Sequence, residues 1–165
     1  MKKLILIFIF IPNILLAGSM KAIGVKGSEK NVDRIIKVSM YDNYYKPNKF
    51  KIKKNETIKF VVENKGELVH EFNIATQEMH LKHQPEMMMM VEHEILLADK
   101  IDKKKMMEMS KKNPAMAHSH SNSVLLSPGE KAELIWKFSN SVDIEAACNV
   151  PGHYDVGMIA KIDSI

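Results

Sequence analysis

The chain has 165 residues, with 24 lysines and arginines against 20 aspartates and glutamates, so its formal net charge is +4 at pH 7. This charge is too mild, and its basic residues are too dispersed, to indicate a nucleic-acid-binding protein. The chain contains a single cysteine, Cys148, which excludes an internal disulfide.

The first 19 residues have the layout of a secretory signal peptide. Lys2 and Lys3 precede a nearly unbroken apolar run over residues 4–16, and small residues follow at 17–19. The alternatives are a membrane anchor or a buried helix, but about 13 apolar residues fall short of the roughly 20 that cross a bilayer. We therefore expect residues 1–19 to be cleaved and the mature protein to be periplasmic or secreted, free of the membrane. Loss of the two lysines lowers its net charge from +4 to +2.

Residues 20–33 form a polar lead-in, and a single domain is expected over residues 34–165. Alternation of apolar with polar residues predicts strands, and one polar face on each strand favours antiparallel pairing. Before residue 77 the predicted inward faces are Ile36, Val38 and Met40; Phe50 and Ile52; Ile58, Phe60 and Val62; and His70, Phe72 and Ile74. Proline and asparagine between these runs supply the turns.

Residues 77–123 interrupt the strand pattern. They contain nine methionines and five histidines, and good helix formers extend over residues 85–111. Pro85 suits a first helical turn, and the pair Asn113-Pro114 suits a helix end. The composition therefore predicts one or two helices and a loop inserted between strands.

Alternation resumes after the insert. The inward positions are Ala132, Leu134, Trp136 and Phe138; then Ile144, Ala146 and Cys148; and finally Met158, Ala160 and Ile162. Short alternating strands separated by turns predict an all-β fold, a sandwich or barrel, with a helical insert.

The sequence CNVPGHYDVGM, residues 148–158, brings three metal-binding side chains into one loop. Cys148 ends a predicted strand, His153 lies in the turn, and Met158 begins the last strand. A fourth ligand is available from His70, at the start of another strand. Two imidazoles, one thiolate and one weak thioether match a type 1 copper site. Zinc normally takes a fourth strong ligand, and an iron–sulfur cluster needs more thiolates than the chain has.

Three segments resemble the cupredoxins, in particular exported proteins of the plastocyanin and azurin type: KPNKFKIKKNETIKFVVENKGELVHEFNI, LLSPGEKAELIWKF and CNVPGHYDVGMIAKI. The resemblance covers most of residues 34–75 and 124–163. It implies a Greek-key β-sandwich that binds one copper ion through His70, Cys148, His153 and the axial Met158. Many relatives have asparagine after the first histidine, where this chain has Glu71, so the hydrogen bonds around the ligands are expected to differ.

The methionines and histidines of the insert allow two interpretations. They can fill a helical core, because methionine packs well into irregular gaps, or they can form a second, softer site for additional Cu(I). The candidate ligands for this accessory site are His83, Met87, Met90, His93, Met116, His118 and His120.

The predicted function is that of an exported one-electron carrier, which exchanges electrons with a redox partner protein through the exposed edge of His153. The alternative is a periplasmic protein that buffers or delivers copper for copper tolerance, with the insert as an accessory site and a copper-accepting protein as its partner. In either case we expect a monomer that is not an enzyme. An oxidase or nitrite reductase is not expected, because the chain is one domain long and lacks the His-Cys-His sequence that links a type 1 site to a multicopper cluster.

Overall fold

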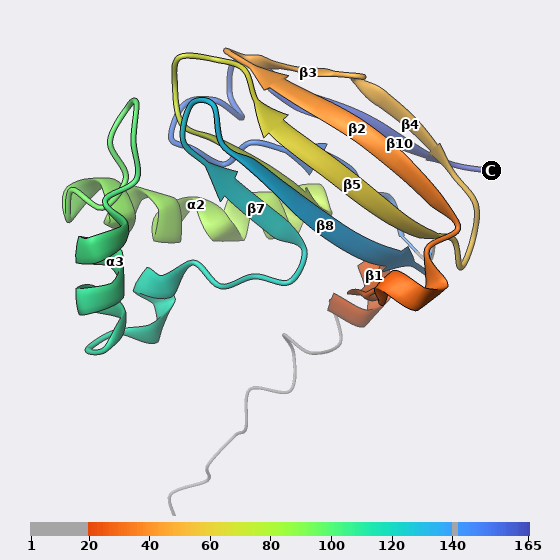
Figure 1. The fold of residues 1–165 in the computed structure, drawn as a ribbon, viewed down its shortest axis with the longest axis horizontal. Coiled ribbons are helices and arrows are strands. Elements are labelled where there is room, and N and C mark those ends of the chain that lie inside the picture. The colour runs from red at the N-terminus through yellow and green to blue at the C-terminus, as the bar shows by residue number, and fades with distance from the viewer. Residues whose placement is uncertain (1–19, 140–141) are drawn as a thin grey trace, which may run out of the picture.

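The computed structural model describes residues 20–139 and 142–165, so the predicted signal peptide lies outside the described residues. Ten strands form two five-stranded sheets (Figure 1). The first sheet has the order β1 (Gly24–Lys26), β8 (Lys131–Phe138), β5 (Thr57–Asn64), β2 (Arg34–Tyr41), β3 (Tyr44–Lys46). The second has the order β4 (Lys49–Ile52), β10 (Ile159–Ser164), β9 (Glu145–Ala147), β6 (His70–Ala75), β7 (Ser123–Leu126).

The predicted all-β sandwich is confirmed, but the expected antiparallel pairing is only partly right. β2 pairs with β5 in parallel, and β10 pairs with β4 in parallel, whereas the remaining pairs are antiparallel. The alternation of apolar and polar residues reports that one face of a strand is buried. It carries no information about the direction of the neighbouring strand.

The core between the sheets consists mostly of side chains that the alternation placed inward. Phe60, Phe72 and Phe138 are fully buried, and Phe60 contacts the rings of the other two at centroid distances of 5.2 and 6.2 Å. Trp136 is also a core residue, and its Nε1 donates a hydrogen bond to the carbonyl of Ile23 at 3.2 Å. Part of the predicted lead-in therefore belongs to the domain, because β1 pairs with β8 and Ile23 is buried.

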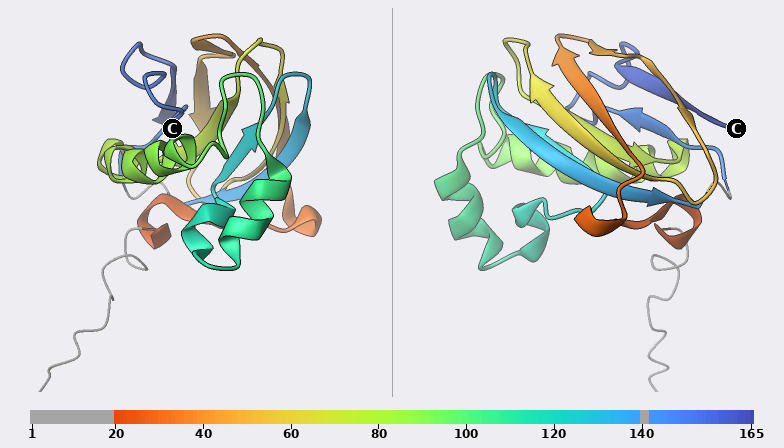
Figure 2. Two further views of the ribbon diagram at one scale, coloured as in Figure 1. Left: turned by 90° about the vertical axis from the view of Figure 1, so that its left-hand side faces the viewer. Right: turned by 45° about the vertical axis from the view of Figure 1, so that its right-hand side comes forward.

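The insert lies beside the sandwich, close to β7 (Figures 1 and 2). It contains the helices α2 (Gln77–Glu92) and α3 (Lys103–Ser110) and the short 3-10 helix η2 (Pro114–Ala117). α2 begins eight residues earlier than predicted, because the Thr76 side chain caps it by accepting a hydrogen bond from the Met79 N–H at 3.2 Å. Pro85 consequently lies inside the helix, where it removes one helical hydrogen bond.

The insert explains why all six residues of β6 are buried. One face of β6 points into the sandwich, and the face that carries Glu71 contacts His83 of α2 and His118, which follows η2. A second apolar cluster forms under the insert from Val69, Met87, Met90, Ile95, Leu96, Ile101 and Met116. Among the described residues, no helix is long and apolar enough to cross a membrane.

Candidate metal centre

Strand pairing brings the predicted ligands to one end of the second sheet, where its interior strands begin or finish. β9 runs antiparallel to β6, with Ala147 opposite Asn73, so Cys148 at the end of β9 lies beside the start of β6, where His70 begins the strand. β10 is antiparallel to β9, so Met158, just before β10, returns to the same end of the sheet. The loop between them is closed by hydrogen bonds from the Cys148 N–H to the Met158 carbonyl, 3.1 Å, and from the Met158 N–H to the His153 carbonyl, 3.0 Å.

Three of the four predicted ligands meet at a point. His70 Nδ1 lies 3.2 Å from His153 Nδ1, and Cys148 Sγ lies 3.9 Å from the first nitrogen and 3.4 Å from the second. The point equidistant from these three atoms is about 2.0 Å from each, within the range of roughly 2.0–2.3 Å for metal bonds to imidazole nitrogen and thiolate sulfur. The spacing of the two imidazole nitrogens and the cysteine sulfur therefore suits one metal ion.

Asp42 orients the His70 ring. Its Oδ1 lies 2.9 Å from His70 Nε2, and its carboxylate also accepts hydrogen bonds from the backbone N–H groups of Glu67 and Leu68. Because Nε2 donates to a carboxylate, Nδ1 keeps its lone pair for a metal. Gly66 makes room for this contact, since a Cβ there would lie 2.3 Å from Asp42 Oδ1 and 2.9 Å from His70 Nε2.

Burial sets the protonation of the metal-free ligands. Burial lowers the pKa of His70, although Asp42 opposes the shift, and it also lowers the pKa of His153. Both rings are therefore neutral at neutral pH, as metal ligands must be. Burial raises the pKa of the Cys148 thiol to about 12, against the stabilising N–H of Glu71. A bound cation must consequently supply the stabilisation that the buried thiolate requires.

Met158 is fully buried and belongs to the same apolar cluster as Cys148. Its backbone bonds to both Cys148 and His153 fix it at the base of the ligand loop. This position is suitable for a long axial contact. The axial role of Met158 itself remains a prediction.

Glu71 ties the two ligand-bearing segments together. Its N–H donates to Cys148 Sγ at 3.3 Å, and its Oε2 accepts hydrogen bonds from the Asn149 side chain at 2.7 Å and the Asn149 backbone N–H at 3.3 Å. Burial alone would raise the pKa of Glu71, but the imidazoles of His118 and His83 outweigh it and hold that pKa well below its usual range. Glu71 is therefore a buried carboxylate anion, linked to both the thiolate ligand and the insert.

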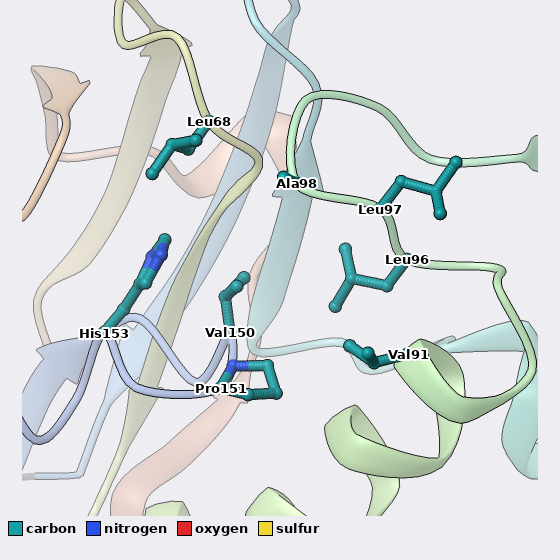
Figure 3. A pocket seen from close by; sticks show the side chains of 8 residues that line it. All are labelled: Leu68, Val91, Leu96, Leu97, Ala98, Val150, Pro151 and His153. Atoms are coloured by element: carbon teal, nitrogen blue, oxygen red, sulfur yellow. The ribbon is translucent and has the colours of Figure 1, made fainter.

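His153 borders a shallow apolar hollow on the surface (Figure 3). The hollow is lined by Leu68, Val91, Leu96, Leu97, Ala98, Val150, Pro151 and His153. The ring of His153 is half-buried, whereas His70 and Cys148 are fully covered. His153 is therefore the one of these three ligands that is partly accessible from the surface.

The predicted accessory ligands divide into two groups. His83, His118 and His120 come together, with ring centroids 4.9–5.1 Å apart. The methionines of that prediction, Met87, Met90 and Met116, are buried instead in the apolar cluster under the insert, and His93 is exposed at the end of α2. Thioethers pack with aliphatic side chains at little cost, so the methionines and the histidines of that prediction lie in different surroundings.

Three residues near these groups were not singled out as ligands or supports from the sequence: Asp42, Glu86 and Asn149. Single carboxylates and amides are too common in a sequence to be selected without a fold. The one local signal was the position of Glu71 directly after His70, where the resemblance implies asparagine.

The fold and the donor set are those of a small copper protein built on a β-sandwich. The family described as "Cupredoxin-like domain" matches residues 7–101. The chain belongs to this cupredoxin-like family. The match includes His70 and stops before the loop that carries Cys148.

Relatives and solved structures agree with this assignment. The chain is 37% identical over 148 residues to the copper-resistant cuproprotein CopI of Pseudomonas aeruginosa, covering 86% of this chain and 82% of that protein. It is 32% identical over 112 residues to the copper-resistant cuproprotein CopI of Vibrio cholerae. This alignment covers 68% of this chain and 53% of that protein. A solved structure of auracyanin B superposes with a TM-score of 0.59 at 11% identity, covering 86% of this chain and 96% of that chain, which supports the fold.

Proposed function

We propose that the protein is an exported copper-tolerance protein that binds copper at His70, Cys148 and His153, with Met158 as the axial ligand. The observation that supports the metal site is the triangle of two imidazole nitrogens and one thiolate sulfur, whose centre lies about 2.0 Å from each atom. One thiolate, two imidazoles and a thioether are the donors of type 1 copper. When bound, copper supplies a one-electron redox couple.

The tolerance role is supported by the relatives, which are named copper-resistant cuproproteins and align over most of this chain. This favours the alternative of the sequence analysis, copper buffering or delivery, over electron carriage as the main role. Export is inferred from the charged and apolar pattern of residues 1–19. No catalytic step is needed for this role, and we infer that the protein is not an enzyme.

Electron carriage is kept as the second candidate because of the surface around His153. A metal ligand that borders an apolar hollow offers a short path from the centre to a docked partner. The two roles differ in stoichiometry, because a buffer protects by occupying one binding site per copper ion, whereas a carrier turns over.

Copper tolerance is tested in bacterial cells that lack a protein of this kind and export graded amounts of this one. We expect the highest copper concentration that permits growth to rise with the amount of exported protein, which is measured by immunoblot of the periplasmic fraction. Cys148→Ser is expected to give no protection at equal abundance. His93→Ala, at an exposed residue away from the centre, is expected to protect like the wild type.

Equal protection by Cys148→Ser and the wild type would contradict copper binding at this centre as the cause of tolerance. Full protection at a protein level far below the copper accumulated by the cells would contradict buffering and favour turnover, as in copper delivery or electron carriage.

A further inference from the structure

A second group of metal-binding side chains lies where the insert covers β6. His83 and Glu86 are three residues apart, so they lie on the same face of α2. His118 and His120 come from the segment after η2 and face them. Each of these four residues offers a ligand atom, and all four atoms lie within 4.8 Å of one another.

Glu86 is at the centre of the group. One of its oxygens lies 2.8 Å from His120 Nε2 and 3.3 Å from His118 Nδ1, and the other lies 3.3 Å from His83 Nδ1. Neighbouring donor atoms around a four-coordinate ion with bonds of about 2.0–2.2 Å are roughly 3.3–3.6 Å apart. The four side chains therefore need only small movements to bind one ion.

The opposite nitrogens of two of these rings point inward to Glu71. His118 Nε2 lies 3.0 Å and His83 Nε2 lies 3.4 Å from Glu71 Oε1, at ion-pair distance. The two side chains are only 3% and 10% exposed. A ring held between a metal and a carboxylate is the usual arrangement of a histidine ligand, in which the carboxylate fixes the ring orientation. Glu71 is placed to serve His83 and His118 in this way.

Charge and exposure also suit a cation. Glu71 and Glu86 bring two negative charges to the group, and no lysine or arginine in residues 20–139 or 142–165 lies within ion-pair distance of either carboxylate. Burial opposes protonation of His83 and His118, but Glu71 and Glu86 raise the pKa of both rings to about 9, so in the metal-free protein these rings carry the balancing protons. A divalent ion balances the two carboxylates in place of those protons. Glu86 and His120 are 19% and 36% exposed, so an ion can enter from solvent on their side.

We propose that His83, Glu86, His118 and His120 form a second metal site, for a divalent ion of borderline softness, with Cu²⁺ bound more tightly than Zn²⁺. Three nitrogens and one oxygen without sulfur favour Cu²⁺ over Cu⁺, and Cu²⁺ exceeds Zn²⁺ in affinity for such donors. The expected accessory Cu(I) site with methionine ligands is thereby replaced by a Cu²⁺ site with histidine and glutamate ligands. This site goes beyond the proposed copper-tolerance function and does not depend on it.

The site is tested in the full chain carrying Cys148→Ala, which removes the thiolate of the first centre. We expect this protein to bind one Cu²⁺ per chain, and Zn²⁺ more weakly, by equilibrium dialysis with Cu²⁺ or Zn²⁺ alone and elemental analysis. Adding Glu86→Gln and His120→Ala is expected to weaken Cu²⁺ binding by at least about 100-fold, above the 10–100-fold cost of losing an outer-shell partner. These two residues are on the solvent side, so Glu71 keeps both of its inner histidines.

His93→Ala in the same background is the matched control and is expected to leave Cu²⁺ binding unchanged. In the chain with Cys148 intact, Glu86→Gln with His120→Ala is expected to lower the count from two Cu²⁺ to one while the visible absorption of the first centre persists, which separates failure of this site from failure of the first. Absence of stoichiometric Cu²⁺ and Zn²⁺ binding in the Cys148→Ala chain, or equal losses with His93→Ala, would overturn the proposal and leave the group as an ion-pair cluster. If a combined variant does not fold, the wild-type count decides between two ions and one.

Discussion

Cys148→Ser is expected to weaken Cu⁺ binding at the first centre by more than about 100-fold, beyond the effect of losing an outer-shell partner. Cys148 supplies the only thiolate of the chain, and it is the softest donor of the triangle with His70 and His153. Serine is slightly smaller and still accepts the hydrogen bond from the Glu71 N–H, so the fold is expected to remain. Competition titration with a chromophoric Cu⁺ chelator measures the change.

The control for this titration is His93→Ala, whose exposed side chain is outside the centre. Its Cu⁺ affinity should equal that of the wild type. Cu⁺ affinity of Cys148→Ser within about threefold of the wild type, a difference below 1 kcal/mol, would show that copper binds elsewhere.

Glu71→Ala is expected to destabilise the metal-free protein by about 3–5 kcal/mol, the usual cost of breaking a buried charge network by removing one partner. The carboxylate accepts two hydrogen bonds from Asn149 and faces His83 and His118 at ion-pair distance. Removal leaves these groups buried without their partner. Urea unfolding at pH 7 measures the free energy, and Glu71→Gln should lose less because its amide oxygen still accepts from Asn149.

Glu67→Ala is the matched control, because Glu67 lies four residues before Glu71, on the connection that leads into β6, and its side chain is exposed. Its free energy of unfolding should stay within about 0.5 kcal/mol of the wild type. A Glu71→Ala protein less than about 1 kcal/mol below the wild type would mean that Glu71 does not hold the ligand loop and the insert together.

The sequence predicts the sandwich and its core well, because alternation reports directly which residues face inward. Phe60, Phe72 and Trp136 are buried as the pattern indicates. It does not predict the parallel pairing of β2 with β5 or the entry of β1 into the sheet, since both depend on partners far apart in the chain.

The ligand loop is predictable because Cys148, His153 and Met158 are close in sequence. His70 is identified through the strand pattern and the family resemblance, and the structure brings it to the same end of the sheet as Cys148. Asp42 could not be identified, because its contact with His70 depends on the turn at Gly66 as well as on the fold.

The insert shows the limit of composition. Methionine serves equally in a core and in a soft metal site, and only three-dimensional packing separates Met87 and Met90 from His83. The histidines instead meet Glu86 and Glu71, whose role depends on β6 being covered by α2 and the segment after η2.

The central claim is that the thiolate of Cys148 and the imidazoles of His70 and His153 bind one copper ion in a trigonal arrangement. It is tested most directly by the visible spectrum and copper count of the purified wild-type protein after loading with Cu²⁺. A thiolate bonded to Cu²⁺ in such a site is expected to give an intense charge-transfer band, so the protein should be blue to green in proportion to the copper at this centre. A stoichiometric Cu²⁺ complex without that band would contradict the assignment.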